Sequence, residues 1–260
     1  MPWLQADPLQ RFTWPIPWYD PGELDDMFET RGFAVFGRRH KDSPLYLLTT
    51  DDLSVLIEEE GVDLDPGFEF SGADSGVLGK TIFRRHETLV RISRLLAEDS
   101  SLENIYRMTL AHEYGHVVLH RQVYEPCFDR IHEMEEVYRG VADPAHRDPL
   151  EWQAGRAAAG LLIPKSVLAR IAGPNYRPVL KRSKNALGLS EFVAKRFKTS
   201  ILAATIRLEN LGYIKEPEFS PDVSQVKQHL DGWRMPEGMV HCSVPLARLM
   251  GAYGFQTKRK

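Results

Sequence analysis

The chain has 260 residues, of which 43% are hydrophobic, 10% aromatic and 27% charged. This is the composition of a globular protein that can bury a sizeable core. The formal net charge of −3 argues against a chain that binds polyanions over its whole surface.

Cysteine content and hydropathy indicate a cellular compartment. Cys127 and Cys242 are the two cysteines, too few for a disulfide framework, so a reducing cytoplasm is expected. The proline-rich start is no signal peptide, and no stretch approaches the roughly 18 apolar residues of a membrane span. We therefore expect a cytoplasmic protein without a membrane association.

The first 20 residues carry four prolines and three of the five tryptophans. So much aromatic surface favours an arm that is laid over the core of the protein. A helix is expected to follow, because Asp20 has the side chain of an N-cap residue and Pro21 suits the first helical position. Gly32 is predicted to end this helix.

Short elements are predicted before the centre of the chain. They are a strand at 33–37, a strand at 44–50, a helix at 51–61 and a loop at 61–76. A β-hairpin is predicted next, with strands at 77–83 and 88–95. Ser100 and Glu103 have the spacing of a capping box, which predicts the start of a long helix near Ser101.

This long helix contains the sequence His-Glu-Tyr-Gly-His and is predicted to run to about Gln122. At about 100° per residue, His112 and His116 leave the same face one turn apart, where one zinc ion can bind both imidazoles. Glu113 lies beside the pair, where it can act as a base on a water molecule rather than as a ligand. The helix is apolar on most faces and is expected to be buried, which makes unpartnered His and Glu side chains costly.

The alternative for the two histidines is hydrogen bonding within the core. A chance match to His-Glu-x-x-His is expected in on the order of a few per cent of such chains, so the buried helical context favours a metal. His120 lies two turns above His112, too far to join it easily, and is expected to balance the helix dipole. Leu119 and Gln122 stand where the metzincin pattern requires Gly and His, which excludes that class.

A second helix, predicted at 149–164, supplies a candidate for the third ligand. Glu151 lies in the middle of its apolar stripe, next to small residues that would let another helix approach closely. A carboxylate in that position must be paired or bound to a metal. An ion pair with an arginine is the alternative; we favour His112, His116 and Glu151 as ligands of a zinc ion.

The sequences "TLAHEYGHVVLH" and "EWQAGRAAAGLLIP" together resemble the ImmA/IrrE family of zinc metallopeptidases. In that family a His-Glu-x-x-His helix is followed by a helix that begins with Glu and ends in Leu-Leu-Met-Pro. This chain departs from the pattern at Gly155, where the family has Asn, at Arg156, where it has Phe, and at Ile163, where it has Met. The resemblance extends over about residues 20–215 and implies a zincin-like domain, a Glu third ligand and a protein substrate. Known members cut a repressor protein and so switch on genes.

Metal chemistry then implies a mechanism. Zinc lowers the pKa of a bound water and polarises the scissile carbonyl, and manganese is a second metal expected to support activity. Glu113 is expected to take the water proton and pass it to the leaving amine. The strand at 88–95 is expected to pair with an extended substrate. The donor that stabilises the oxyanion stays open, with Tyr106, Tyr124 and His120 as weak candidates.

Between Pro174 and Lys215 the chain has nine Lys or Arg and two Glu residues, a local net charge of +7. Two short helices are predicted there around a three-residue turn, with Ser190 and Ser200 as N-caps and Gly212 at the end, which resembles a helix-turn-helix. The candidates for phosphate contacts on DNA, or for contacts with a partner, are Lys195, Arg196, Lys198 and Arg207. The alternatives are a helical pair packed on the peptidase, or a surface that docks an acidic partner.

These patterns predict an α+β protein in four parts. They are an arm at 1–20, a zincin-like metallopeptidase domain at 21–172, a basic helix-turn-helix-like region at 173–215 and a C-terminal extension at 216–260. The expected function is a zinc endopeptidase that cleaves a regulatory protein, in particular a helix-turn-helix repressor, to switch on a stress or mobile-element response. The alternative is a DNA-binding regulator or antitoxin-like module with a structural or vestigial zinc site, which would not need Glu113.

Overall fold

The computed structural model describes residues 3–4, 16–17, 19–74, 76–125, 128, 133–137, 149–171 and 186–214. Its helices are α1 (Pro21–Arg39), α2 (Thr50–Glu59), α3 (Arg94–Glu98), α4 (Glu103–Tyr124), α5 (Pro149–Leu162), α7 (Ala186–Phe197) and α8 (Ile201–Asn210), with residues 165–171 also helical. Its strands are β1 (Trp3–Leu4), β2 (Ile16–Pro17), β3 (Asp63–Phe68), β4 (Gly79–Arg84), β5 (Thr88–Ser93) and β6 (Glu133–Val137). This mixture confirms the predicted α+β class.

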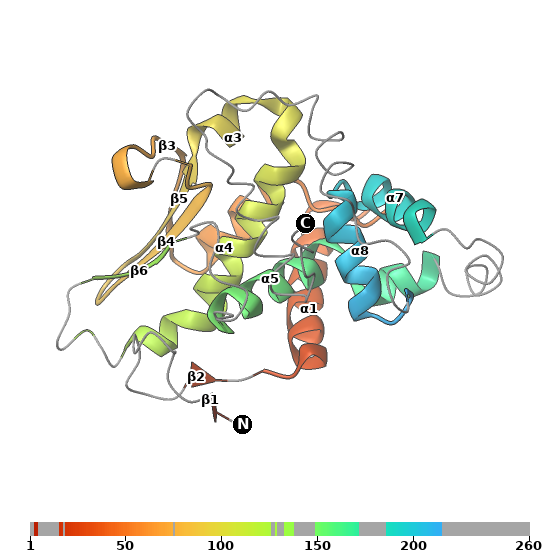
Figure 1. Cartoon of the computed structure of the whole chain (residues 1–260), viewed down its shortest axis with the longest axis horizontal. Helices are drawn as coiled ribbons and strands as arrows, with labels where there is room; N and C mark the ends of the chain where they lie inside the picture. The colour runs from red at the N-terminus through yellow and green to blue at the C-terminus, as the bar shows by residue number, and fades with distance from the viewer. Residues whose placement is uncertain are drawn as a thin grey trace, which may run out of the picture.

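A four-stranded sheet lies on one side of the molecule, with the strand order β3-β5-β4-β6 (Figure 1). β4 and β5 form the predicted hairpin, in which Thr81 is opposite Val90. β3 runs parallel to β5, and β6 runs antiparallel to β4. The prediction that the strand at 88–95 pairs with a substrate is therefore wrong, because both edges of β5 are already bonded to neighbouring strands.

Helix α4 lies between the sheet and the helices α1 and α5 (Figure 1). Its start differs from the predicted capping box at Ser100 and Glu103. The Asp99 carboxylate accepts a hydrogen bond from the Ser101 N–H at 2.9 Å, and residues 100–102 form a 3₁₀ turn before α4 begins. Asp99 takes the capping role because its side chain sits one residue before that turn.

Helices α4 and α5 approach each other closely at Gly115. A Cβ atom added to Gly115 would lie 3.0 Å from both the Cα and the carbonyl oxygen of Ala154, and 3.1 Å from the Cβ of Ala157. Two of these three atoms are backbone atoms, which cannot move aside without shifting α5. Glycine at 115 therefore allows α5 at Ala154 and Ala157 to lie against the histidine turn of α4.

Buried charges join α1, α5 and α8. Asp25 is 1% exposed and accepts hydrogen bonds from Arg156 at 2.7 Å and from Arg207 at 2.6 Å. Arg107 of α4 donates to the carbonyl oxygen of Phe197 at 2.9 Å, at the end of α7. Removing one member of such a network leaves a buried charge without its partner, so these contacts hold α7 and α8 to the core.

The predicted end of the first helix at Gly32 and the strand predicted at 33–37 are wrong, because α1 continues to Arg39. A Cβ at Gly32 would collide with the Tyr46 hydroxyl, so this glycine allows a side chain to pack against the helix. The rings of Phe33 and Phe36 lie 5.1 and 5.0 Å from the Tyr46 ring. Within the run at 33–37, Val35 is buried and Phe33 and Phe36 are partly buried, so the apolar side chains of this stretch pack from a helix and not from a strand.

The next stretch corrects two further predictions. The strand predicted at 44–50 is absent, since residues 44–49 form no strand and Thr49 caps α2 in a capping box with Asp52. The predicted loop at 61–76 contains β3, whose side chains are mostly exposed and so carry no apolar alternation. The helix predicted at 51–61 is confirmed as α2.

The predicted arm is described in part. β1 and β2 pair antiparallel, with Trp3 opposite Pro17. The extension at 216–260, Cys127 and Cys242 lie outside the described residues. Within the described segments, we find no helix with both the length and the apolar character needed to cross a membrane.

The contact at Gly115 generates a stability prediction. Gly115→Ala is expected to lower the free energy of unfolding by about 1–3 kcal/mol, because the added methyl group overpacks the contact with α5. This loss would occur although alanine is favoured over glycine in a helix by about 1 kcal/mol. Urea-induced unfolding measures the difference.

Gly188→Ala is the matched control, because a Cβ at this position of α7 would meet no atom within 4 Å. It is expected to leave stability unchanged or to raise it slightly. A Gly115→Ala protein as stable as the control would contradict the close contact between α4 and α5.

Candidate metal centre

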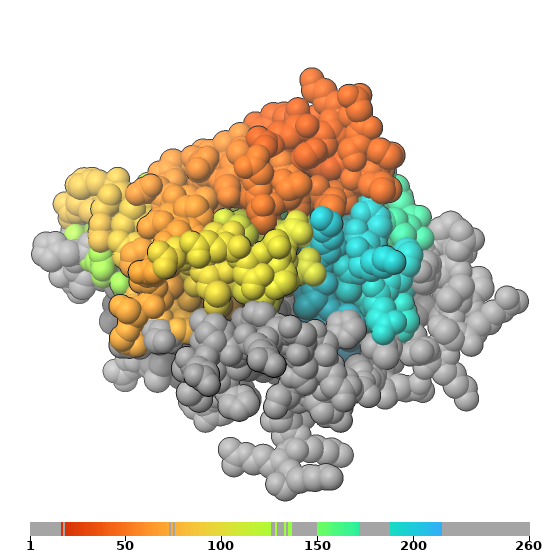
Figure 2. All heavy atoms as spheres, turned by 90° about the horizontal axis from the view of Figure 1, so that it is seen from above, coloured from red at the N-terminus to blue at the C-terminus, as the bar shows by residue number. Residues whose placement is uncertain are grey.

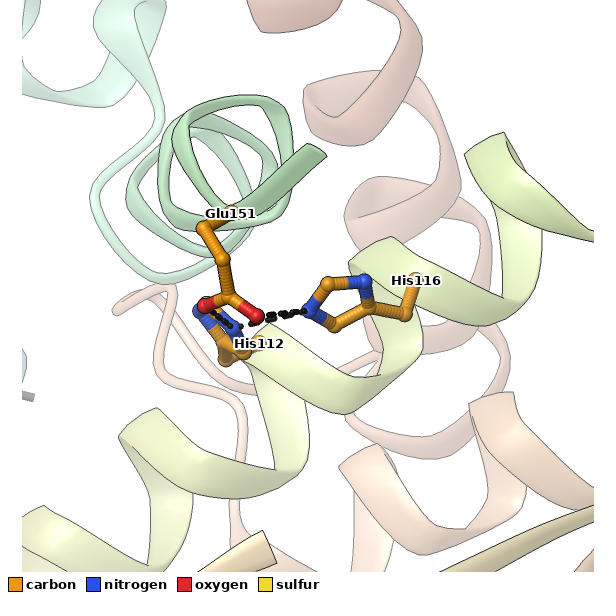
Figure 3. A group of neighbouring side chains, drawn as sticks. All are labelled: His112, His116 and Glu151. Carbon is orange, nitrogen blue, oxygen red and sulfur yellow. Dashed lines mark hydrogen bonds and ion pairs between the residues drawn. The ribbon is translucent and has the colours of Figure 1, made fainter. Parts of the chain in front are cut away.

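Three buried side chains converge between α4 and α5. His112 and His116 project from consecutive turns of α4, and Glu151 reaches them from the first turn of α5 (Figure 3). The two Nε2 atoms are 3.0 Å apart. The Glu151 carboxylate oxygens lie 3.2 Å from the Nε2 of His112 and 3.5 Å from the Nε2 of His116. The structure thus brings together all three predicted ligands.

The spacing of these donor atoms fits a divalent metal ion. Tetrahedral zinc with bonds of about 2.0–2.1 Å has ligand atoms about 3.3 Å apart. The three observed separations, from 3.0 to 3.5 Å, bracket this value. Two imidazole nitrogens and one carboxylate are also the protein ligands of one class of catalytic zinc site, which keeps a fourth position for water or substrate.

Glu151 is a carboxylate held in its ionised form. Burial by itself would raise the pKa of this carboxyl, but hydrogen bonds from His112 and His116 outweigh the burial and hold the pKa well below its ordinary value. An ionised carboxylate facing two imidazoles is the protonation state that a metal ligand requires.

Glu113 has a different environment from Glu151. Its Oε2 accepts a hydrogen bond from the Thr81 hydroxyl of β4 at 2.6 Å. A Cβ at Gly79 would lie 2.5 Å from its Oε1, so β4 can pass this close only with glycine there. Burial raises the pKa of Glu113 to about 7, despite the opposing effects of His112 and Thr81. A carboxyl with a pKa near neutrality can both accept and release a proton at pH 7.

A chain of hydrogen bonds runs from His116 away from the centre. The Nδ1 of His116 lies 2.8 Å from the Nδ1 of His120, whose Nε2 lies 3.2 Å from the Oε1 of Gln153. The amide nitrogen of Gln153 donates to the carbonyl oxygen of Pro17 at 2.7 Å. If the Nε2 of His116 faces a metal, each group in this chain donates to the next, which fixes both imidazole tautomers.

The expected role of His120 at the helix dipole is therefore wrong. Burial, together with the charge of His116, lowers the pKa of His120 well below its ordinary value. A neutral, fully buried imidazole adds no positive charge to the end of the helix. Its place between His116 and Gln153 makes it a positioning residue for the histidine pair.

The four basic candidates do not form one surface. Arg207 is 0% exposed and paired with Asp25, so the prediction that it meets phosphate is wrong. Residues 202–208 of α8 are all buried, which prevents this helix from entering a DNA groove. Lys195 and Lys198 are exposed and Arg196 is half-buried, on α7 and the turn after it.

The caps of the helix pair follow the prediction in part. Ser200 accepts a hydrogen bond from the Ala203 N–H at 3.1 Å, and Gly212 ends the second helix with a φ of 73°. Ser190 is not an N-cap, because α7 begins at Ala186 and the Ser190 hydroxyl accepts a bond from Thr205. The Ser190 hydroxyl instead joins α7 to α8 through this hydrogen bond.

Four residues near the centre were not identified from the sequence, namely Gly79, Thr81, Gly115 and Gln153. The sequence contained a signal for Gly115, because a small residue inside the histidine motif indicates that another helix approaches there. The sequence contained no signal for Thr81 or Gln153. Each is an ordinary polar residue of a strand or helix, and the side chain that it contacts is known only from the tertiary structure.

The ligand geometry generates a prediction about metal content. The wild-type chain is expected to hold about one zinc ion, and His112→Ala, His116→Ala or Glu151→Ala is each expected to lose it, because two ligands do not suffice. Elemental analysis after dialysis measures the metal. Glu125→Ala, at an exposed acid beyond the end of α4, is the control and should keep it. Full occupancy in Glu151→Ala would remove Glu151 from the ligand set.

The hydrogen-bond chain generates a second prediction about the metal. Gln153→Leu and His120→Phe leave all three ligands in place but remove the partner that orients His116. Each is expected to weaken zinc affinity by about 10–100-fold, as for other partners of metal ligands. Competition with a chelating dye measures the affinity, and Gln122→Leu, at an exposed position of α4, is the control. Affinities equal to that of the control would show that the chain does not orient the ligand.

Comparison with known proteins bears on the same region. Residues 82–209 match the family Peptidase_M78, described as the IrrE N-terminal-like domain. The match extends from β4 into α8 and includes the whole of α4 and α5. Neither curated proteins nor solved structures gave a match. Residues 82–209 therefore carry the pattern of an IrrE N-terminal-like peptidase domain, in agreement with the resemblance of the two helices to ImmA/IrrE proteins.

Proposed function

We propose that the protein is a zinc-dependent endopeptidase. The observation that carries this proposal is the convergence of His112, His116 and Glu151 within bonding distance of one metal ion, beside a fourth buried group, Glu113, that is not part of the ligand cluster. The match to a peptidase family supports the same reaction class. Zinc is the metal we propose, because two imidazoles and one carboxylate suit it, and manganese is the second metal to supply in assays.

A metal ion held by these three residues would polarise the scissile carbonyl and acidify a water molecule. Glu113 accepts the proton of the attacking water and delivers it to the leaving amine. Thr81 holds one oxygen of this carboxylate by a hydrogen bond, which leaves the other free for proton transfer. His120 holds the His116 ring with its Nε2 directed toward Glu151.

The substrate we propose is a cytoplasmic regulatory protein, in particular a helix-turn-helix transcriptional repressor. Its cleavage would switch on a stress or mobile-element response. The resemblance to the ImmA/IrrE family supports this substrate class. The alternative, a DNA-binding regulator with a structural zinc site, is less well supported, because α8 is buried and a structural site has no use for Glu113.

Replacement of Glu113, the proposed base, tests the catalytic step without removing a metal ligand. Glu113→Gln keeps the size of the side chain and an acceptor for Thr81, but removes the proton acceptor. It is expected to keep its zinc and its fold and to lose about 10²–10⁴ in the rate of cleavage. A gel assay with zinc or manganese, and with a helix-turn-helix repressor as substrate, measures the rate.

Glu125→Gln is the control for the loss of one carboxylate and should cleave at the wild-type rate. Undiminished cleavage by Glu113→Gln would contradict the role of the base. Absence of cleavage by the wild type, with either metal and with any repressor, would contradict the proposed activity itself.

A further inference from the structure

A groove lies between the end of α1, the segment 40–49 and α7, with a volume of about 730 Å³. Figure 2 shows the same neighbourhood from outside, where the cyan surface of α7 borders the orange surface of the first third of the chain. Among the residues that the structure describes, the exposed large apolar side chains are Leu45 (56%) and Phe192 (41%), and both line this groove. Phe36 and Leu47 extend its apolar lining. Exposed apolar side chains gathered at one hollow mark a contact surface.

The rim of the groove is basic. Lys195, Arg196 and Lys198 line it, and none of the described lining residues is acidic. Lys195 and Lys198 are exposed, and Lys198 has only a loose surface pair, 3.6 Å from Glu103. Such a pair contributes little by itself and gives way readily to a better acidic partner. The groove therefore combines an apolar floor with an excess of positive charge.

The backbone conformation of Lys198 also points to a role for its side chain. Its φ of 49° is in the left-handed region, and no other non-glycine residue in the described part of the chain has a positive φ. Its carbonyl oxygen accepts a hydrogen bond from Arg107, which holds the turn in this conformation. Glycine would adopt this backbone at a lower cost. A lysine here places a charge at the groove at the expense of backbone strain, as expected where the side chain has a role.

We infer that this groove binds an acidic segment of a partner protein, one that carries a large apolar side chain between carboxylates. The apolar side chain would bury against Leu45 and Phe192, and the carboxylates would meet Lys195 and Lys198. Aromatic side chains are enriched at protein interfaces, and complementary charges select and orient the partner. The volume is in the range of sites that enclose a small ligand or a few side chains. A DNA backbone offers phosphates to the lysines but nothing to fill the apolar floor.

This surface is separate from the metal centre. Arg107, which holds the turn at Lys198, lies about 140° around α4 from His112 at 100° per residue. The groove and the ligands thus lie on different sides of α4, and binding there does not depend on the proposed peptidase activity. Loss of binding and loss of cleavage can be measured independently.

The test uses a random-peptide display library, because no partner sequence is assumed. Peptides are selected for binding to the immobilised wild-type chain. Those that also bind the Phe192→Ser variant are discarded, because they bind outside the groove. The expected outcome is enrichment of sequences in which two or more Asp or Glu residues flank Leu, Phe or Trp. Enrichment of basic or uncharged sequences, or no sequence that distinguishes the two proteins, would overturn the inference.

The affinity of one enriched peptide, measured by fluorescence polarisation, then tests single side chains. Phe192→Ser and Lys195→Glu are each expected to weaken binding by about tenfold or more. Arg170→Glu, at an exposed residue outside the groove, is the matched charge control and should bind as the wild type does. Equal binding by Lys195→Glu and the control would overturn the role of the basic rim.

Lys198→Gly separates binding from stability. Glycine relieves the backbone, so the midpoint of thermal unfolding is expected to stay unchanged or to rise by up to about 4 °C, while peptide binding weakens. Wild-type peptide binding by this variant would show that the lysine side chain has no part in recognition. DNA and a second copy of the chain are the other occupants to test, by salt-dependent binding of duplex DNA and by light scattering. If Lys195→Glu abolishes DNA binding, or Phe192→Ser abolishes a dimer, while peptide binding is unchanged, the groove belongs to that partner instead.

Discussion

The close approach of α4 and α5 at Gly115 determines where the candidate metal ligands meet. With no side chain at Gly115, the backbone of α5 at Ala154 lies directly against α4. Glu151 is one turn before Ala154, so its carboxylate reaches the Nε2 atoms of His112 and His116 at 3.2 and 3.5 Å. A wider separation of the helices would leave a buried carboxylate without partners, which is costly. The packing of the two helices therefore favours the same geometry that metal binding by these three residues would need.

Two carboxyl groups near this contact are driven in opposite directions by their surroundings. The histidines hold the pKa of Glu151 well below its ordinary value, whereas burial raises the pKa of Glu113 to about 7. Groups whose environments separate their pKa values in this way are suited to different roles in one reaction. Glu151 is suited to remain an anion and hold a cation, and Glu113 is suited to exchange a proton. Thr81 on β4 restrains the second of these groups, so the sheet contributes to the site as well as the helices.

The grouping of His112, His116 and Glu151 and part of the fold were predictable from the sequence, for a physical reason. The spacing of His112 and His116 is a local property of a helix, and Glu151 was found because a carboxylate in an apolar stripe needs a partner. Gln153 and Thr81 were missed, because their contacts depend on how separate elements pack. Gly32 was misread as a helix end, since a glycine needed for close packing and one needed for a turn look alike in a sequence. Arg207 was misassigned for a similar reason, because a count of charges does not distinguish a buried ion pair from a phosphate contact.

A single metal ion bound between α4 and α5 would be located by diffraction measured at the zinc absorption edge from crystals of the zinc-loaded chain. We expect a single anomalous peak about 2.0–2.2 Å from the Nε2 of His112, the Nε2 of His116 and a carboxylate oxygen of Glu151. Glu113 should lie outside bonding distance of that peak. A zinc ion bound to Glu113 or His120 in place of Glu151, or no peak between the two helices, would contradict this metal site.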